Sequence, residues 1–273
     1  MARKIVLGLF VVATVVWGTL ALALQIDVVD GTLQGIRLFG QAPEVQVEGN
    51  GEPAEQPFGG EDPLRMIVIA AESVVAGAAY WIGILLALFA TGGLVASMMD
   101  RGQVDLLLSK PLGRSTVLGG RLLGVGIVVA LLAFYLMGMV WLVMSLKTGV
   151  WNPRFLLAIG VVLAMFAVVY SVVTLVSVSS GSAPLALVVT LGLLFVSLVV
   201  ALPGLPDKLQ EPWRQVVQAL HAVLPRFADV GGRTVPSLAR GVPVRSWTHL
   251  VASLGFGLVA YAAAFAVFRR KDF

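Results

Sequence analysis

Charged residues interrupt an apolar sequence at residues 98–117, and their spacing could support binding to a partner. Polar and apolar residues there recur at intervals of three and four, so they fall on different faces of a helix. The polar face holds Arg101, Asp105 and Ser109, and the apolar face holds Val104, Leu107 and Leu108. Pro111 disfavours a helical conformation at Lys110 and ends this helix. The segment is therefore predicted to be an amphipathic helix at a membrane surface, serving either as a docking element or as a surface anchor without a partner.

Sequence motifs for catalysis are absent. No G-x-x-x-x-G-K-[ST] motif occurs, so this chain does not bind ATP through a P-loop. There is no H-E-x-x-H motif, and with two histidines and no cysteine a metal cluster is not expected. The serines near residues 171–182 have no nearby base and are interpreted as packing or turn residues. We therefore expect a protein that is not an enzyme and that binds no cofactor itself.

Glu72 is an ionisable residue beside an otherwise apolar segment. An acid inside a bilayer is a candidate for function, for example in proton coupling. A helix beginning near Asp62 and Pro63 would instead place Glu72 at the external headgroup level, where a carboxylate costs little. The headgroup position is favoured, and a functional role is the alternative.

The composition predicts that these residues belong to an integral membrane protein. The chain has 273 residues, of which 58% are hydrophobic and 12% charged, with a mean hydropathy of +0.94. Segments of about 20 apolar residues can span a bilayer. Six qualify: residues 5–24, 74–97, 122–146, 156–178, 183–203 and 248–268. The fold expected is an all-α, six-span bundle forming a single domain over residues 1–273.

The distribution of lysine and arginine indicates the orientation. Nine lie on the side of the termini, and four lie on the other side when residues 204–246 are left out; that long loop adds six. Residues 25–62 carry eight acids against one arginine, which favours an external position. We therefore expect cytoplasmic termini, an acidic external loop at 25–62 and an external loop at 204–246. The basic residues form no continuous stripe, so nucleic acid is not an expected partner.

The first apolar segment could also be a signal peptide, since Arg3 and Lys4 precede it and Ala21-Leu22-Ala23 resembles a cleavage site. Its apolar run of about 20 residues is long for that role, which favours a membrane span.

The loops carry patterns of their own. Residues 27–33 and 44–48 are predicted to form short strands, the first around an Asp-Gly turn, and residues 50–63 a flexible connector. Residues 179–182, followed by Pro184, predict a tight turn between two helices. Residues 213–224 have the period of an amphipathic interfacial helix that Pro225 ends, with His221 on its solvated face. The glycines and prolines that follow predict an irregular segment.

The run from Asp100 to Arg114, followed by residues 119–124, resembles the segment after the second span in type-2 ABC transporter permeases. The basic end at residues 268–273 and Leu224-Pro225-Arg226-Phe227 are similar to two further motifs of that family. Arg121 stands where the family commonly has lysine, and an interfacial helix ahead of the first span is missing.

This resemblance implies a permease that couples ATP hydrolysis by separate P-loop ATPase subunits, which bind ATP and Mg²⁺, to transport, with export preferred. It implies a coupling helix within residues 98–117 and an external re-entrant region at 204–246. The implied ATPase interface comprises Asp100, Arg101, Gln103, Val104, Asp105, Leu107, Leu108, Lys110, Pro111 and Arg114. The other implied partners are a second permease copy, identical or paralogous, and the lipid of a bacterial-type cytoplasmic membrane.

Two other classes of function compete with this interpretation. A secondary transporter or channel would use no ATPase, but the spans lack paired ionisable residues and evident inverted repeats. A membrane assembly scaffold would leave no sequence signature.

Overall fold

Helices make up most of the computed structural model, which describes residues 2–29, 32–38, 63–99, 113–202, 204–208 and 210–270. The α-helices are α1 (Ala2–Ala23), α2 (Pro63–Ala78), α3 (Ile84–Ala96), α5 (Arg114–Ala133), α6 (Met139–Thr148), α7 (Pro153–Ser180), α8 (Ala183–Val200), α9 (Leu205–Lys208), α10 (Trp213–Val223), α11 (Phe227–Asp229), α12 (Val235–Ala239) and α13 (Thr248–Arg270). Three π-helical turns, η1 (Ala79–Gly83), η3 (Phe134–Gly138) and η4 (Val230–Thr234), and the 3₁₀ turn η2 (Ser97–Met99) complete the helical elements.

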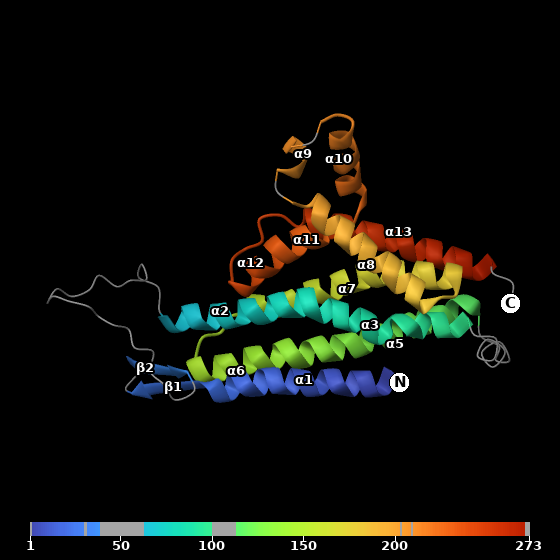
Figure 1. Ribbon diagram of the computed structural model, residues 1–273. Helices are drawn as coiled ribbons and strands as arrows, with labels where there is room; N and C mark the ends of the chain where they lie inside the picture. The colour runs from blue at the N-terminus through green and yellow to red at the C-terminus, as the bar shows by residue number, and fades with distance from the viewer. Residues whose placement is uncertain are drawn as a thin grey trace.

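Five helical segments of the described chain are long and apolar enough to cross a bilayer. They are Arg65–Ala96, Ser115–Thr148, Pro153–Ser180, Ala183–Val200 and Thr248–Arg270. The first two each run through a π-turn without a break, and they extend beyond the predicted spans at 74–97 and 122–146. Helix α1 overlaps the first predicted span, residues 5–24, and within its described side chains Leu7–Thr19 is apolar. The first residues of α1 and the last of α13 lie toward the same end of the bundle (Figure 1).

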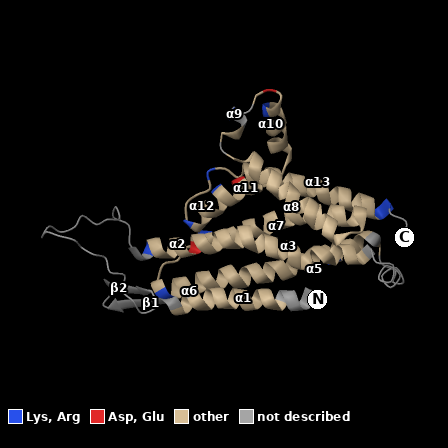
Figure 2. Cartoon of the chain, viewed as in Figure 1, with Lys and Arg blue, Asp and Glu red and all other residues tan. Residues whose placement is uncertain are grey.

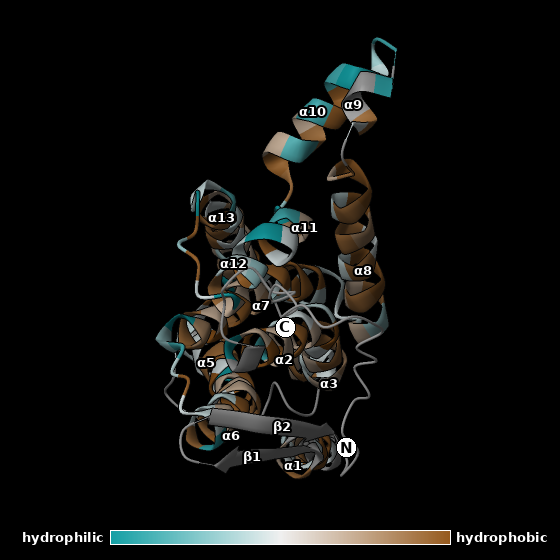
Figure 3. Cartoon of the chain, turned by 90° about the vertical axis from the view of Figure 1, so that its left-hand side faces the viewer, coloured by the Kyte–Doolittle hydropathy of each residue, from teal (hydrophilic) through white to brown (hydrophobic). Residues whose placement is uncertain are grey.

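Helix α7 is the centre of the bundle. In its most apolar 18-residue stretch, 67% of the residues are buried inside the bundle. The corresponding share is 22–28% for Ser115–Thr148, α8 and α13. It packs against α3, α8, α12 and α13, and a helix that is apolar on all sides is expected in such a position. The outer helices turn apolar side chains outward, and Figure 3 shows the bundle as predominantly hydrophobic. That surface suits a lipid environment.

The predicted turn between two helices is confirmed at residues 181–182. Gly181 ends α7 with a φ of 70°, a left-handed conformation that favours glycine. Ser182 caps α8 by accepting a hydrogen bond from the backbone N–H of Leu185 at 3.4 Å, and Pro184 lies in the first turn of α8.

The short strands predicted on either side of Asp30-Gly31 are also confirmed, while the turn itself lies outside the described residues. Strands β1 (Leu24–Val29) and β2 (Thr32–Leu38) pair antiparallel, with Val29 opposite Thr32 and Leu24 opposite Leu38. The second predicted strand, at 44–48, and the predicted connector at 50–63 lie outside the described residues, except that α2 begins at Pro63 as expected.

The segment after α8 is more ordered than the sequence predicts. Helix α10 and its end before Pro225 agree with the prediction, and α9 and α10 stand away from the bundle (Figure 1). The predicted irregular segment is wrong over residues 227–239, where α11, η4 and α12 form nearly continuous helix. Gly231 lies against Tyr80 and Trp81, where a Cβ would not fit, and Pro236 comes two residues after the π-turn η4.

Candidate functional site

The predicted docking segment is described only at its two edges. Asp100, Arg101, Gln103, Val104, Asp105, Leu107, Leu108, Lys110 and Pro111 lie outside the described residues, and Arg114 is the first residue of α5. At the edges, Arg121 Nη2 of α5 donates a hydrogen bond to Ser97 Oγ of η2 at 2.9 Å. The backbone carbonyl of Gly113 accepts from the N–H of Thr116 at 2.9 Å. Arg121 thus links the end of α3, which precedes the docking segment, to α5, which follows it.

Leu224-Pro225-Arg226-Phe227 forms a junction that joins three separate parts of the bundle. The Pro225 carbonyl accepts a hydrogen bond from Ser197 Oγ of α8 at 2.6 Å. The Arg226 N–H donates to Ser253 Oγ of α13 at 2.9 Å. The Phe227 carbonyl accepts a hydrogen bond from Tyr80 Oη of η1 at 2.6 Å. Three consecutive residues of this motif are therefore hydrogen-bonded to side chains of other helices.

Aromatic rings pack against one another at the same junction. The Phe227 ring stacks on Tyr80 with centroids 4.6 Å apart, and it meets Trp81 edge-on at 5.3 Å. Gly231 of η4 lies against both, since a Cβ built there would lie 2.4 Å from Tyr80 Cε1 and 2.9 Å from Trp81 Cζ2. Two π-turns, η1 and η4, therefore meet here, and π-turns inside helices are frequent at functional positions.

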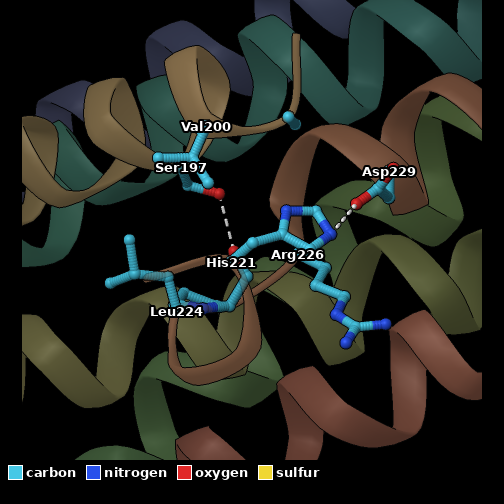
Figure 4. Close-up of a pocket in the computed structure, with 8 residues that line it drawn as sticks. Ser197, Val200, His221, Leu224, Arg226 and Asp229 are labelled. Carbon is cyan, nitrogen blue, oxygen red and sulfur yellow. Dashed lines mark hydrogen bonds and ion pairs between the residues drawn. The ribbon is translucent and has the colours of Figure 1, made fainter. Parts of the chain in front are cut away.

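A charged cluster lies beside the junction and is centred on Asp229, which is 7% exposed (Figure 4). Asp229 Oδ2 lies 3.6 Å from His221 Nε2 and 4.0 Å from His249 Nδ1. Its Oδ1 lies 3.6 Å from Arg233 Nη2, and Arg226 Nη1 donates to His249 Nδ1 at 3.2 Å. Both histidines of the chain therefore contact one carboxylate.

His221 lies on the polar face of α10 and its side chain is 37% exposed, which agrees with the prediction, and it also faces Asp229 of the bundle. Its Nε2 lies 3.6 Å from Asp229 Oδ2, and this contact joins the projecting helix α10 to the bundle. A buried carboxylate is costly unless opposite charges or hydrogen-bond donors compensate it. Arg233 faces Asp229 Oδ1, whereas Oδ2 accepts no hydrogen bond in the described structure. A hollow of about 260 Å³ opens between α8, α10 and the cluster. No group of acids and histidines suited to a metal occurs among the described residues.

Glu72 forms a second polar site, inside the bundle. Its side chain is fully buried, and Oε2 accepts a hydrogen bond from Asn152 Nδ2 at 2.7 Å. Asn152 Nδ2 also donates to the Ala239 carbonyl at 2.8 Å, while Trp141 Nε1 donates to the Asn152 carbonyl at 3.0 Å. Glu72 Oε1 has no hydrogen-bond partner in the described structure. The sequence favoured a headgroup depth for this acid, and the structure adds that protein encloses its side chain.

Sequence reasoning overlooked Asn152, Tyr80 and Asp229, although the last two lie close to features that it noted. The Leu-Pro-Arg-Phe motif signalled the junction, and the scarcity of histidine and acid near the spans could have signalled the cluster. Asn152 gave no signal, because its partner Glu72 is 80 residues away in the sequence.

Comparison with known proteins places this architecture in a family. A sequence profile described as "ABC-2 family transporter protein" matches residues 22–273, which include the junction, the Asp229 cluster and Glu72. No curated protein matches the chain.

Proposed function

The chain belongs to the ABC-2 family of transporter proteins, and on that premise we propose that it is the membrane-spanning permease subunit of an ABC transporter. ATP is bound and hydrolysed by separate P-loop ATPase subunits, and export from the cytoplasm is the preferred direction. The observation that carries the proposal is the family match over residues 22–273, which extends across the docking segment and the five apolar spans.

In this proposal α1 supplies a sixth span, which puts both termini and residues 98–117 on the cytoplasmic side of a bacterial-type inner membrane. The arrangement in Figure 1 supports this, because α3 ends and α5 begins toward the end of the bundle where α1 begins and α13 ends. A second permease copy, identical or paralogous, would cover part of the outward apolar surface of the outer helices.

The contacts suggest how the docking segment could act on the rest of the protein. The segment is joined directly to α3, and α3 is continuous with η1, which carries Tyr80. Tyr80 donates a hydrogen bond to the Phe227 carbonyl and packs on Gly231. A displacement of α3 would therefore move the junction and the neighbouring Asp229 cluster. Closure of the ATPases would then favour one arrangement of this junction, and the bundle would change access by a shift in population.

Asp105→Lys and Pro111→Ala test the coupling. Both changes lie in the docking segment and leave the spans intact, so membrane insertion should be unaffected. ATP hydrolysis should no longer respond to transport in the reconstituted complex, because the first reverses a charge and the second removes the residue that ends the docking helix. The matched control is Arg214→Glu, a charge reversal on the exposed face of α10. Coupling that is unchanged in both docking variants would refute the assignment of this segment.

Glu72 is the observation that favours the competing function, an ATP-independent transporter. A fully buried carboxylate with one unpaired oxygen could exchange a proton during transport. In that case transport by the isolated chain would follow a proton gradient and would need no ATPase. In the permease proposal, Glu72 holds Asn152 in place.

A further inference from the structure

A second cavity, of about 220 Å³, lies at the end of the bundle where α2 and α7 begin and α6 ends. Its lining contains three arginines from three elements: Arg65 of α2, Arg154 of α7 and Arg240, which follows α12. Figure 2 shows Lys and Arg at the start of α2 and around α12. No acid lines the cavity, and in the described part of the chain none of these arginines forms an ion pair with a carboxylate. The charged side chains in the described lining of this cavity are therefore all basic, with Glu72 behind Asn152, whereas in the Asp229 hollow an arginine faces a carboxylate.

One of the three arginines is held by a backbone carbonyl. Arg154 Nη1 donates a hydrogen bond to the Gly241 carbonyl, which ties the start of α7 to the end of α12. Asn152, fixed by Glu72 and the Ala239 carbonyl, forms the wall between them. Gly241 has a φ of 69°, and a Cβ there would lie 3.1 Å from Asn152 Oδ1, so the wall is tightly built.

The cavity also has the groups and the size that an anion needs. It holds the volume of about seven water molecules. The positive end of the 28-residue helix α7 opens into it at Pro153 and Arg154. Guanidinium groups donate paired hydrogen bonds that match the geometry of phosphate oxygens.

Apolar surface continues from the cavity along the spans. Trp151 lines the cavity and is 56% exposed, and tryptophan is enriched at the membrane interface. Leu157 is exposed and follows Arg154 by three residues, so it lies on the same face of α7 one turn further along the helix. A ligand with a phosphate and an acyl chain would meet basic groups and then apolar surface in that order.

We propose that the cavity formed by Arg65, Arg154 and Arg240 binds a phosphate group, and specifically the phosphate of a membrane amphiphile whose chain lies along α7. The site is separate from the docking segment, so it does not depend on the ATPase partner. Its occupant would bridge α2, α7 and α12, the elements that also hold Glu72 and Asn152.

Binding to the full-length protein in a non-ionic detergent tests this proposal. The probes are a short-chain phosphatidic acid, the diacylglycerol with the same chains and inorganic phosphate. We expect the phosphatidic acid to bind, and Arg65→Gln with Arg240→Gln to weaken that binding at least about tenfold, since hydrogen bonds between charged groups are lost. The matched control, Arg214→Gln with Arg245→Gln, removes two exposed arginines that do not line the cavity and should bind as the unchanged protein does.

Arg65→Lys with Arg240→Lys keeps the charge and removes only the paired donors, so an intermediate affinity is expected and a folding defect is avoided. Equal binding by the glutamine variant and the unchanged protein would overturn the proposal, as would equal binding of the diacylglycerol. Displacement of the phosphatidic acid by inorganic phosphate at a similar concentration would overturn the amphiphile as ligand and make free phosphate the occupant.

Discussion

Gly231→Ala should destabilise the protein, because Gly231 lies where two π-turns touch. The new Cβ would lie 2.4 Å and 2.8 Å from Cε1 and Cδ1 of Tyr80 and 2.9 Å from Cζ2 of Trp81. Tyr80 has no room to move, since it is fully buried, stacked on Phe227 and bonded to the Phe227 carbonyl. Overpacking of this kind costs about 1–3 kcal/mol.

Gly232→Ala is the matched control, because it lies in the same π-turn and a Cβ there has no neighbour within 4 Å. Both substitutions gain the same backbone preference of alanine over glycine in a helix, about 0.5–1 kcal/mol. The overpacking cost is then the difference between the two variants, and it corresponds to about 2–12 °C in melting temperature.

Thermal unfolding of the two purified variants in detergent measures this difference. Gly231→Ala should melt below Gly232→Ala, and replacing Tyr80 by leucine should remove most of the gap by making space for the new methyl group. Equal melting temperatures for the two alanine variants would refute the close contact, and with it the proposed route from α3 to the junction.

Two further predictions concern the buried acids. Glu72→Gln keeps an oxygen for Asn152 and should change the free energy of unfolding by less than about 1 kcal/mol, whereas Glu72→Ala removes the acceptor and leaves space and should cost about 2–3 kcal/mol, as measured by denaturation in detergent. ATP-dependent transport that survives Glu72→Gln would contradict a proton-coupling role. Asp229→Asn removes the charge that faces both histidines, so amide hydrogen exchange in α10 should rise while exchange in α7 stays constant; unchanged exchange in α10 would show that this contact does not hold the helix.

The sequence predicts the helices of this protein well, because apolar runs of about 20 residues report their environment directly. The turn at Gly181 and the paired strands on either side of Asp30-Gly31 were also predictable, since each depends on residues that are neighbours in the chain. Residues 227–239 were not, because their glycine and proline content suggested a loop, and Gly231 packs against Tyr80 from a distant part of the chain.

The polar sites were harder to predict than the helices. Glu72 could be singled out, but whether it is buried depends on Asn152 and Ala239, which reach it from other parts of the chain. His221 was placed on the polar face of its helix, but its contact with Asp229 was not predicted, because Asp229 lies beyond the end of that helix. The helical period describes one helix at a time, so it gives no information on which side chains meet between helices.

Co-purification tests the central claim most directly. The chain is co-expressed with candidate P-loop ATPases and recovered from detergent, as the unchanged protein and with Arg101→Glu and Asp105→Lys combined. The permease account predicts that an ATPase is recovered with the unchanged protein and lost with the double variant, while Arg214→Glu retains it. Recovery of no ATPase with a well-folded, unchanged protein would contradict the account and favour an ATP-independent transporter or a scaffold.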